Sequence, residues 1–110
     1  MEYTSMSEDL SIASIIRDQL GGRRFEVMTG AKRFVAIASG LQFRLPDNAK
    51  DGINCVEITL TPADLYDVSY LNVRGAQVKE ISRDENIYAE DLSSSFLKAT
   101  GLFTSLGQTR

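Results

Sequence analysis

The stretch LQFRL, Leu41 to Leu45, shows the clearest strand pattern in the chain. Leu41, Phe43 and Leu45 alternate with two polar residues, which is the period of a strand with one buried face. Pro46 follows directly and has no backbone N–H to donate, so we expect the strand to end there. We predict that the three apolar side chains face the core.

Further strands are expected on the C-terminal side of this stretch. Apolar residues alternate from Val56 to Leu60, and the Thr-Pro-Ala-Asp at 61–64 is typical of a turn. In the next segment, 66–73, the inward face changes from Tyr70 to Leu71 and Val73, so we expect a β-bulge near Tyr70. The segment AQVKEIS, residues 76–82, is predicted to be one more strand.

On the N-terminal side, the pattern predicts a helix followed by a hairpin. Apolar residues recur at helical spacing from Ile12 to Leu20, and Gly21 stands where a helix often ends. The period changes to two at 25–28, TGAK at 29–32 interrupts it, and 33–38 resumes as an apolar strand. We therefore predict a β-hairpin over 25–38.

The C-terminal segment EDLSSSFLKATG, residues 90–101, predicts a helix that presents Leu92, Phe96 and Ala99 on one stripe and ends at Gly101. A helix, a run of strands and a second helix favour a single α+β domain over 1–110. We expect an antiparallel β-meander of about five to six strands, with the N-terminal and C-terminal helices packed on one face. Residues 1–8 are expected to be disordered and 103–110 to form a frayed tail.

Composition supports one globular domain: the chain has 110 residues, of which 43% are hydrophobic and 25% charged. The longest apolar run, Phe34 to Ala38, is far too short to cross a bilayer. The acidic, polar N-terminus is unlike a signal peptide, and a single cysteine cannot form an internal disulfide. We expect a cytoplasmic protein without a membrane contact.

The residue inventory excludes several kinds of chemistry. Without histidine, no imidazole can activate a nucleophile or bind zinc, and one cysteine cannot build a thiolate cluster. Serine–lysine catalysis stays formally open, but no serine and lysine stand out as a pair. The spacing around Lys32 does not fit a phosphate loop, and PDNAKDG, residues 46–52, lacks ligands that a calcium loop needs. We expect no enzyme activity, no cofactor and no metal.

The stretch LGGRRFEVMTGAKRFV, residues 20–35, holds four of the twelve basic residues of a chain whose net charge is −3. Local clusters of basic residues can bind phosphate groups, and Phe25 and Phe34 could stack on bases or else belong to the core. The candidate nucleic-acid-binding residues are the four basic residues of this stretch and one on the next strand: Arg23, Arg24, Lys32, Arg33 and Arg44.

The same stretch, together with LQFRLP, ITLTPADLYDV and FLKATGL, resembles a family of small uncharacterised proteins encoded by bacteriophages and prophages. The resemblance runs from Leu20 to Leu102 and implies a bacterial host cytoplasm. It favours a non-enzymatic accessory protein that binds another protein or itself. The alternative is a nucleic-acid-binding module that uses the basic hairpin around residues 23–33.

Overall fold

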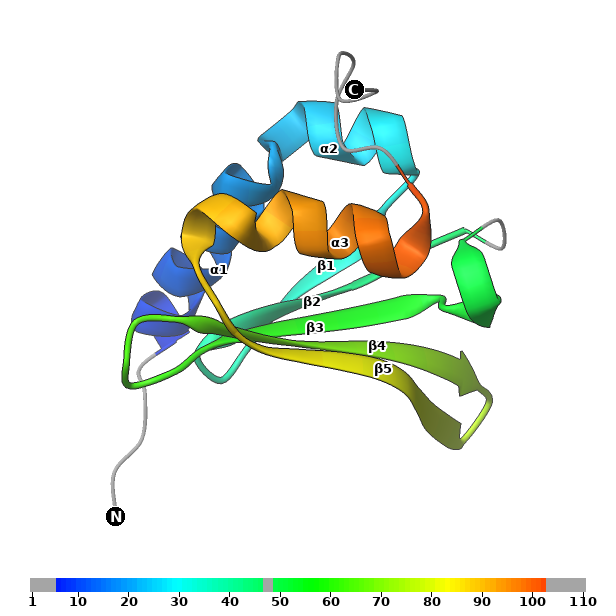
Figure 1. Ribbon diagram of the computed structural model, residues 1–110. Coiled ribbons are helices and arrows are strands. Elements are labelled where there is room, and N and C mark those ends of the chain that lie inside the picture. The colour runs from blue at the N-terminus through cyan, green and yellow to red at the C-terminus, as the bar shows by residue number, and fades with distance from the viewer. Residues whose placement is uncertain (1–5, 47–48, 103–110) are drawn as a thin grey trace.

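The computed structural model describes residues 6–46 and 49–102. Its helices and strands follow one another in the order shown in Figure 1. They are α1 (Met6–Leu20), α2 (Gly22–Thr29), β1 (Lys32–Ile37), β2 (Gly40–Arg44), β3 (Cys55–Leu60), β4 (Tyr66–Arg74), β5 (Gln77–Ile87) and α3 (Leu92–Thr100). Short 3-10 turns at Lys50–Gly52 and Ala89–Asp91 precede β3 and α3.

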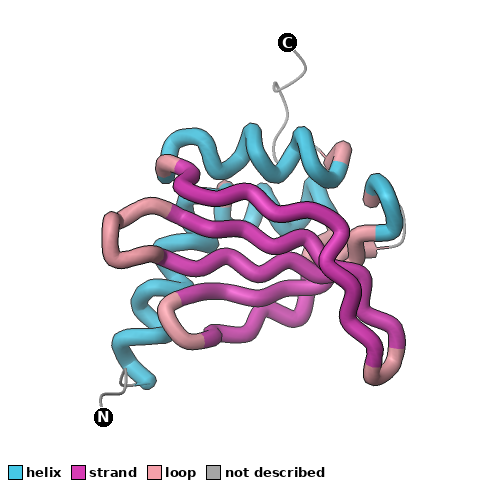
Figure 2. The backbone as a smooth tube through the Cα atoms, turned by 60° about the horizontal axis from the view of Figure 1, so that its bottom comes forward, coloured by secondary structure: helices cyan, strands magenta, loops and turns pink. Residues whose placement is uncertain are grey.

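The five strands form one open antiparallel sheet in the order β1-β2-β3-β4-β5. All three helices lie on one face of this sheet, and the other face carries no helix (Figures 1 and 2). The predicted α+β meander with helices on one face is therefore confirmed. No described helix is both long and apolar enough to span a membrane.

The core lies between the sheet and the helices, as LQFRL predicts. Leu41, Phe43 and Leu45 are all buried. The Phe43 ring centroid lies 5.4 Å from that of Phe25 on α2 and 6.2 Å from that of Phe96 on α3. One aromatic cluster thus joins the second strand to both helices that flank the sheet in sequence.

The predicted hairpin over 25–38 is wrong in its first half, because residues 22–29 form the helix α2. Two consecutive glycines, Gly21 and Gly22, both with positive φ, turn the chain between α1 and α2. Phe25 and Thr29, four residues apart, are buried on one face of α2. The alternation at 25–28 is too short to exclude a helix, and tertiary packing decides between the two structures.

Helices α2 and α3 end in the same way, with the pattern Phe-x-x-x-Thr-Gly at 25–30 and at 96–101. In each, the threonine hydroxyl donates to the phenylalanine carbonyl four residues earlier, at 2.7 Å and 2.8 Å. Gly30 and Gly101 then adopt the left-handed conformation, with φ of 77° in both. The Phe25 and Phe96 rings meet edge to face at 5.1 Å, so the paired helix ends close the core.

The bulge expected near Tyr70 is confirmed, because the register of β4 against β5 shifts between Tyr70 and Leu71. The expected continuation of the inward face is wrong, however. Leu71 pairs with Cys55 on the helix-free face, where both are buried. Strand β5 also extends five residues beyond the predicted end at 82. Helix α1 begins at Met6, and the expectations for 1–5 and 103–110 lie outside the described residues.

Candidate binding site at the β1 edge

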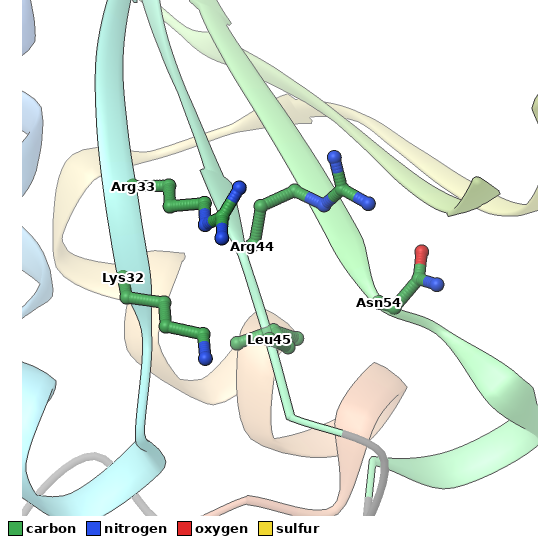
Figure 3. Close-up of a pocket in the computed structure, with 5 residues that line it drawn as sticks. All are labelled: Lys32, Arg33, Arg44, Leu45 and Asn54. Carbon is green, nitrogen blue, oxygen red and sulfur yellow. The ribbon is translucent and has the colours of Figure 1, made fainter. Parts of the chain in front are cut away.

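A shallow pocket opens where β1 and β2 lie side by side, and Figure 3 shows the residues that line it. Lys32 and Arg33 come from β1, and Arg44 comes from the end of β2. Lys32 stands directly opposite Arg44 in the strand register. We call Lys32, Arg33 and Arg44 the basic pocket; Leu45 and Asn54 complete its lining.

A β-bulge brings two consecutive basic residues of β1 to this pocket. The register shifts between Lys32 and Val35, and Arg33 has φ of 59°. Figure 3 shows Lys32 and Arg33 both extending from β1 toward β2. In a regular strand, neighbouring side chains point to opposite faces. The bulge is therefore the local feature that lets both side chains reach the same pocket.

The backbone conformation of Arg33 is unusual for its residue type. The other described non-glycine residues with positive φ are Ser39, Asp51, Asp64 and Asn86. Aspartate and asparagine tolerate this region because their short polar side chains can hydrogen-bond locally, whereas a long side chain costs about 1–2 kcal/mol there. The strain at Arg33 marks a position that the rest of the fold holds in place.

The three cations of the basic pocket have no acidic partner among the described residues. The ion pairs of residues 6–46 and 49–102 involve only Arg17 and Arg83 as cations. Glu57, a nearby carboxylate on the same face of the sheet, accepts a hydrogen bond from Gln42 Nε2 at 2.6 Å. The Asn54 side chain is also committed, because its amide exchanges two hydrogen bonds with the Val73 backbone. Within the described residues, the positive charge of the pocket is therefore not paired with a carboxylate.

The structure brings together three of the five predicted basic residues and leaves two apart. Arg23 and Arg24 lie exposed in the first turn of α2 and do not line the basic pocket. The two phenylalanines that could have stacked on bases belong to the core. Phe25 is fully buried, and the partly buried Phe34 packs 5.2 Å from Phe43.

Among the described strands, β1 beside the basic pocket pairs on one side only, with β2. Val35 is 51% exposed on this strand. Sequence reasoning missed Val35 as a surface residue because every residue from Phe34 to Ala38 is apolar. It also missed Asn54, whose place in the pocket depends on pairing with β4 far along the chain. The bulge, too, leaves no signal in the sequence beyond the Lys-Arg pair itself.

A second polar cluster lies between the sheet and α3. The Ser95 hydroxyl donates to Asp84 Oδ2 at 2.5 Å and lies 3.3 Å from the Tyr70 hydroxyl. Burial raises the pKa of Tyr70 to about 12, and the Asp84 charge acts in the same direction against the Ser95 hydrogen bond. These contacts tie α3 to β4 and β5.

Other reactive groups of the described residues include the Cys55 thiol and the carboxylates. Burial raises the pKa of the Cys55 thiol, and the nearby Arg44 charge offsets only part of this effect. The thiol is therefore a weak nucleophile at neutral pH. Across the described part of the chain, no three acidic or cysteine side chains gather as metal ligands would.

Comparison with protein-family models, with curated proteins and with solved structures finds no match to this chain.

Proposed function

We propose that this chain is a non-enzymatic binding protein that adds an extended segment of another protein to its edge strand β1. The observation that carries the proposal is the free edge itself. A strand paired on one side only presents backbone N–H and C=O groups to a new strand, and proteins often bind extended peptides in this way. The half-exposed Val35 gives such a segment an apolar contact.

The residue inventory supports binding over catalysis. The chain has no histidine. Ser95 is hydrogen-bonded to Tyr70 and to Asp84, and these contacts hold α3 on the sheet. The resemblance to phage-encoded proteins supports an accessory role in a bacterial cytoplasm.

The two edges of the sheet provide a matched test of this function. Val35 on β1 and Val78 on β5 are both exposed valines on edge strands, at 51% and 63%. We expect the wild-type protein to bind a synthetic peptide of alternating valine and threonine residues, measured by fluorescence anisotropy. Val35→Lys should abolish this binding, because it replaces the apolar contact within the strand by a third positive charge. Val78→Lys should leave it unchanged.

Analytical sedimentation of the unlabelled protein tests whether the partner is a second copy of this chain. Association that depends on concentration and disappears in Val35→Lys would identify the β1 edge as a self-association surface. Equal loss of binding in both lysine variants, or no binding in the wild type, would contradict the proposed function.

Nucleic-acid binding is the second candidate, favoured by the unpaired cations of the basic pocket. Phosphate contacts weaken steeply with added salt, so a gel shift with a single-stranded oligonucleotide at low and high salt tests it. Two observations count against this candidate. Phe25 and Phe34 belong to the core, and the whole chain carries a net charge of −3.

A further inference from the structure

The basic pocket and the free edge of β1 are parts of one continuous surface. Lys32 and Arg33 open the strand, and Val35 follows on the same strand with its side chain half exposed. A segment that pairs along β1 would therefore run directly into the pocket at one end. Any partner of this edge meets the positive charge of Lys32, Arg33 and Arg44.

Uncompensated cations beside one another cost stability unless a ligand uses them. Arg33 bears the additional strain of a positive φ, and glycine would remove that strain. Proteins depart from the locally favourable choice mainly at functional sites. Arg33 thus combines two unfavourable features, a charge unpaired within the described residues and a positive φ. Both accompany the placement of its guanidinium group in the pocket.

Resting on the strand pairing proposed above, we infer that the basic pocket binds the carboxylates of an acidic run at one end of the partner segment. The planar guanidinium groups of Arg33 and Arg44 suit bidentate hydrogen bonds to a carboxylate. The Asn54 amide, held by the Val73 backbone, forms a wall of the pocket, and the three cations supply the charged donors. The partner therefore carries apolar residues for β1 and acidic residues for the pocket.

An acidic protein segment fits this surface better than a nucleic acid does. A peptide strand uses the backbone edge, the exposed Val35 and the pocket together, whereas a nucleic acid would use only the three cations. Stacking is excluded for Phe25 because its ring is fully buried. A long polyanion would also meet the net negative charge of the rest of the chain, which disfavours its approach.

A second copy of this chain is a poorer occupant than a separate acidic segment. Its acidic edge strand is β5, but the carboxylates of Glu80 and Glu85 there already contact Arg83. These carboxylates would have to give up their contacts with Arg83 in order to bind the basic pocket. Charge complementarity therefore points to a partner whose carboxylates are free.

The experiment compares peptides that differ only in their charged end. The first joins alternating valines and threonines to a run of glutamates, and its companions carry glutamines or lysines in place of the glutamates. We expect the glutamate peptide to bind at least about tenfold more tightly than the glutamine peptide, as one charge-assisted contact allows. This advantage should shrink as salt is added.

Two double variants with the same change in net charge locate the effect. Arg33→Gln with Arg44→Gln should remove the advantage of the glutamate peptide. Arg23→Gln with Arg24→Gln changes two exposed arginines outside the pocket and should preserve it. Circular dichroism and thermal unfolding of both proteins verify that the fold is intact.

Each outcome decides one of the two proposals. Equal affinity for the glutamate and glutamine peptides would overturn the carboxylate pocket and leave strand addition standing. Binding to none of the peptides would contradict the proposed function itself. Tighter binding of a single-stranded oligonucleotide, lost only in the Arg33 and Arg44 double variant, would assign the pocket to nucleic acid and overturn the inference.

Discussion

The two edges of the sheet, β1 and β5, each carry two basic residues, and of these four only Arg83 on β5 forms ion pairs within the described residues. On β5, Arg83 contacts Glu85 at 2.8 Å, Asp67 at 3.6 Å and Glu80 at 3.9 Å. On β1, Lys32 and Arg33 have no acidic partner among the described residues. Charged side chains on an edge strand resist a new strand in general, but charge of one sign attracts a segment of complementary charge. The two edges therefore differ in the pairing of their charges more than in the number of their basic residues.

The largest expected effect is the loss of stability when the core that supports both edges is truncated. Phe43 is fully buried on β2 and contacts phenylalanines from α2, α3 and β1. We expect Phe43→Ala to lower the free energy of unfolding by about 3–5 kcal/mol, measured by urea denaturation. A loss below about 1 kcal/mol would mean that β2 does not form the base of the core.

The next effect concerns the β4–β5 side and is a dependence on alkaline pH. Burial holds the pKa of Tyr70 at about 12 in the folded protein, above the ordinary value of 10.0. The folded state therefore keeps its proton while the unfolded state releases it. The resulting stability is fully present below pH 10 and is lost as the pH rises from 10 to about 12.

This loss should amount to about 2–3 kcal/mol, from two pKa units at 1.36 kcal/mol each. Urea denaturation at several alkaline pH values measures it, and Tyr70→Phe is the control because it cannot ionise. The variant should show a flatter pH profile. An identical decline in Tyr70→Phe and in the wild type would contradict the assigned burial.

A smaller effect on stability is expected at two residues, one on each edge strand, that share the same backbone conformation. Arg33 on β1 and Asn86 on β5 both have φ of 59°. Arg33→Gly should raise the free energy of unfolding by about 0.5–1 kcal/mol, since glycine relieves most of the strain but loses more chain entropy on folding. Asn86→Gly should change it little, because asparagine tolerates this conformation.

The same pair separates stability from binding. Arg33→Gly should bind the glutamate-ended peptide more weakly while being more stable, and Asn86→Gly should bind it as the wild type does. Thermal unfolding and fluorescence anisotropy on the same samples check both statements. A destabilised Arg33→Gly would show that the arginine side chain supports the fold.

The smallest expected effect lies at the β5 edge. Arg83 is exposed, and ion pairs of this kind contribute little to stability. Arg83→Gln should leave the midpoint of thermal unfolding and the affinity for the glutamate-ended peptide nearly unchanged. Tighter peptide binding in this variant would mean that the freed carboxylates or the β5 edge take part in recognition.

Much of the fold could be predicted from the sequence because period and turn residues act locally. LQFRL and the Gly101 helix end lie as their patterns predict. The sequence also contains a signal that could have corrected the strand predicted at 25–28. The pattern Phe-x-x-x-Thr-Gly, which ends α3, also occurs at 25–30 and marks the end of α2.

The candidate site could be predicted only in part. Residue type alone indicated Lys32, Arg33 and Arg44 as a basic group. Their separation from Arg23 and Arg24 depends on α2 being a helix, and their convergence depends on a bulge in β1. A bulge reflects the register between strands, which is a property of the whole sheet and not of one segment.

The central claim is that β1, and not β5, is the binding edge of this protein. Nuclear magnetic resonance of the isotope-labelled protein, titrated with the glutamate-ended peptide, tests it residue by residue. We expect the largest changes in amide chemical shift over Lys32–Ile37 and at Arg44, with Gln77–Ile87 unaffected. Changes centred on Gln77–Ile87, or confined to the exposed surface of α2, would contradict the account.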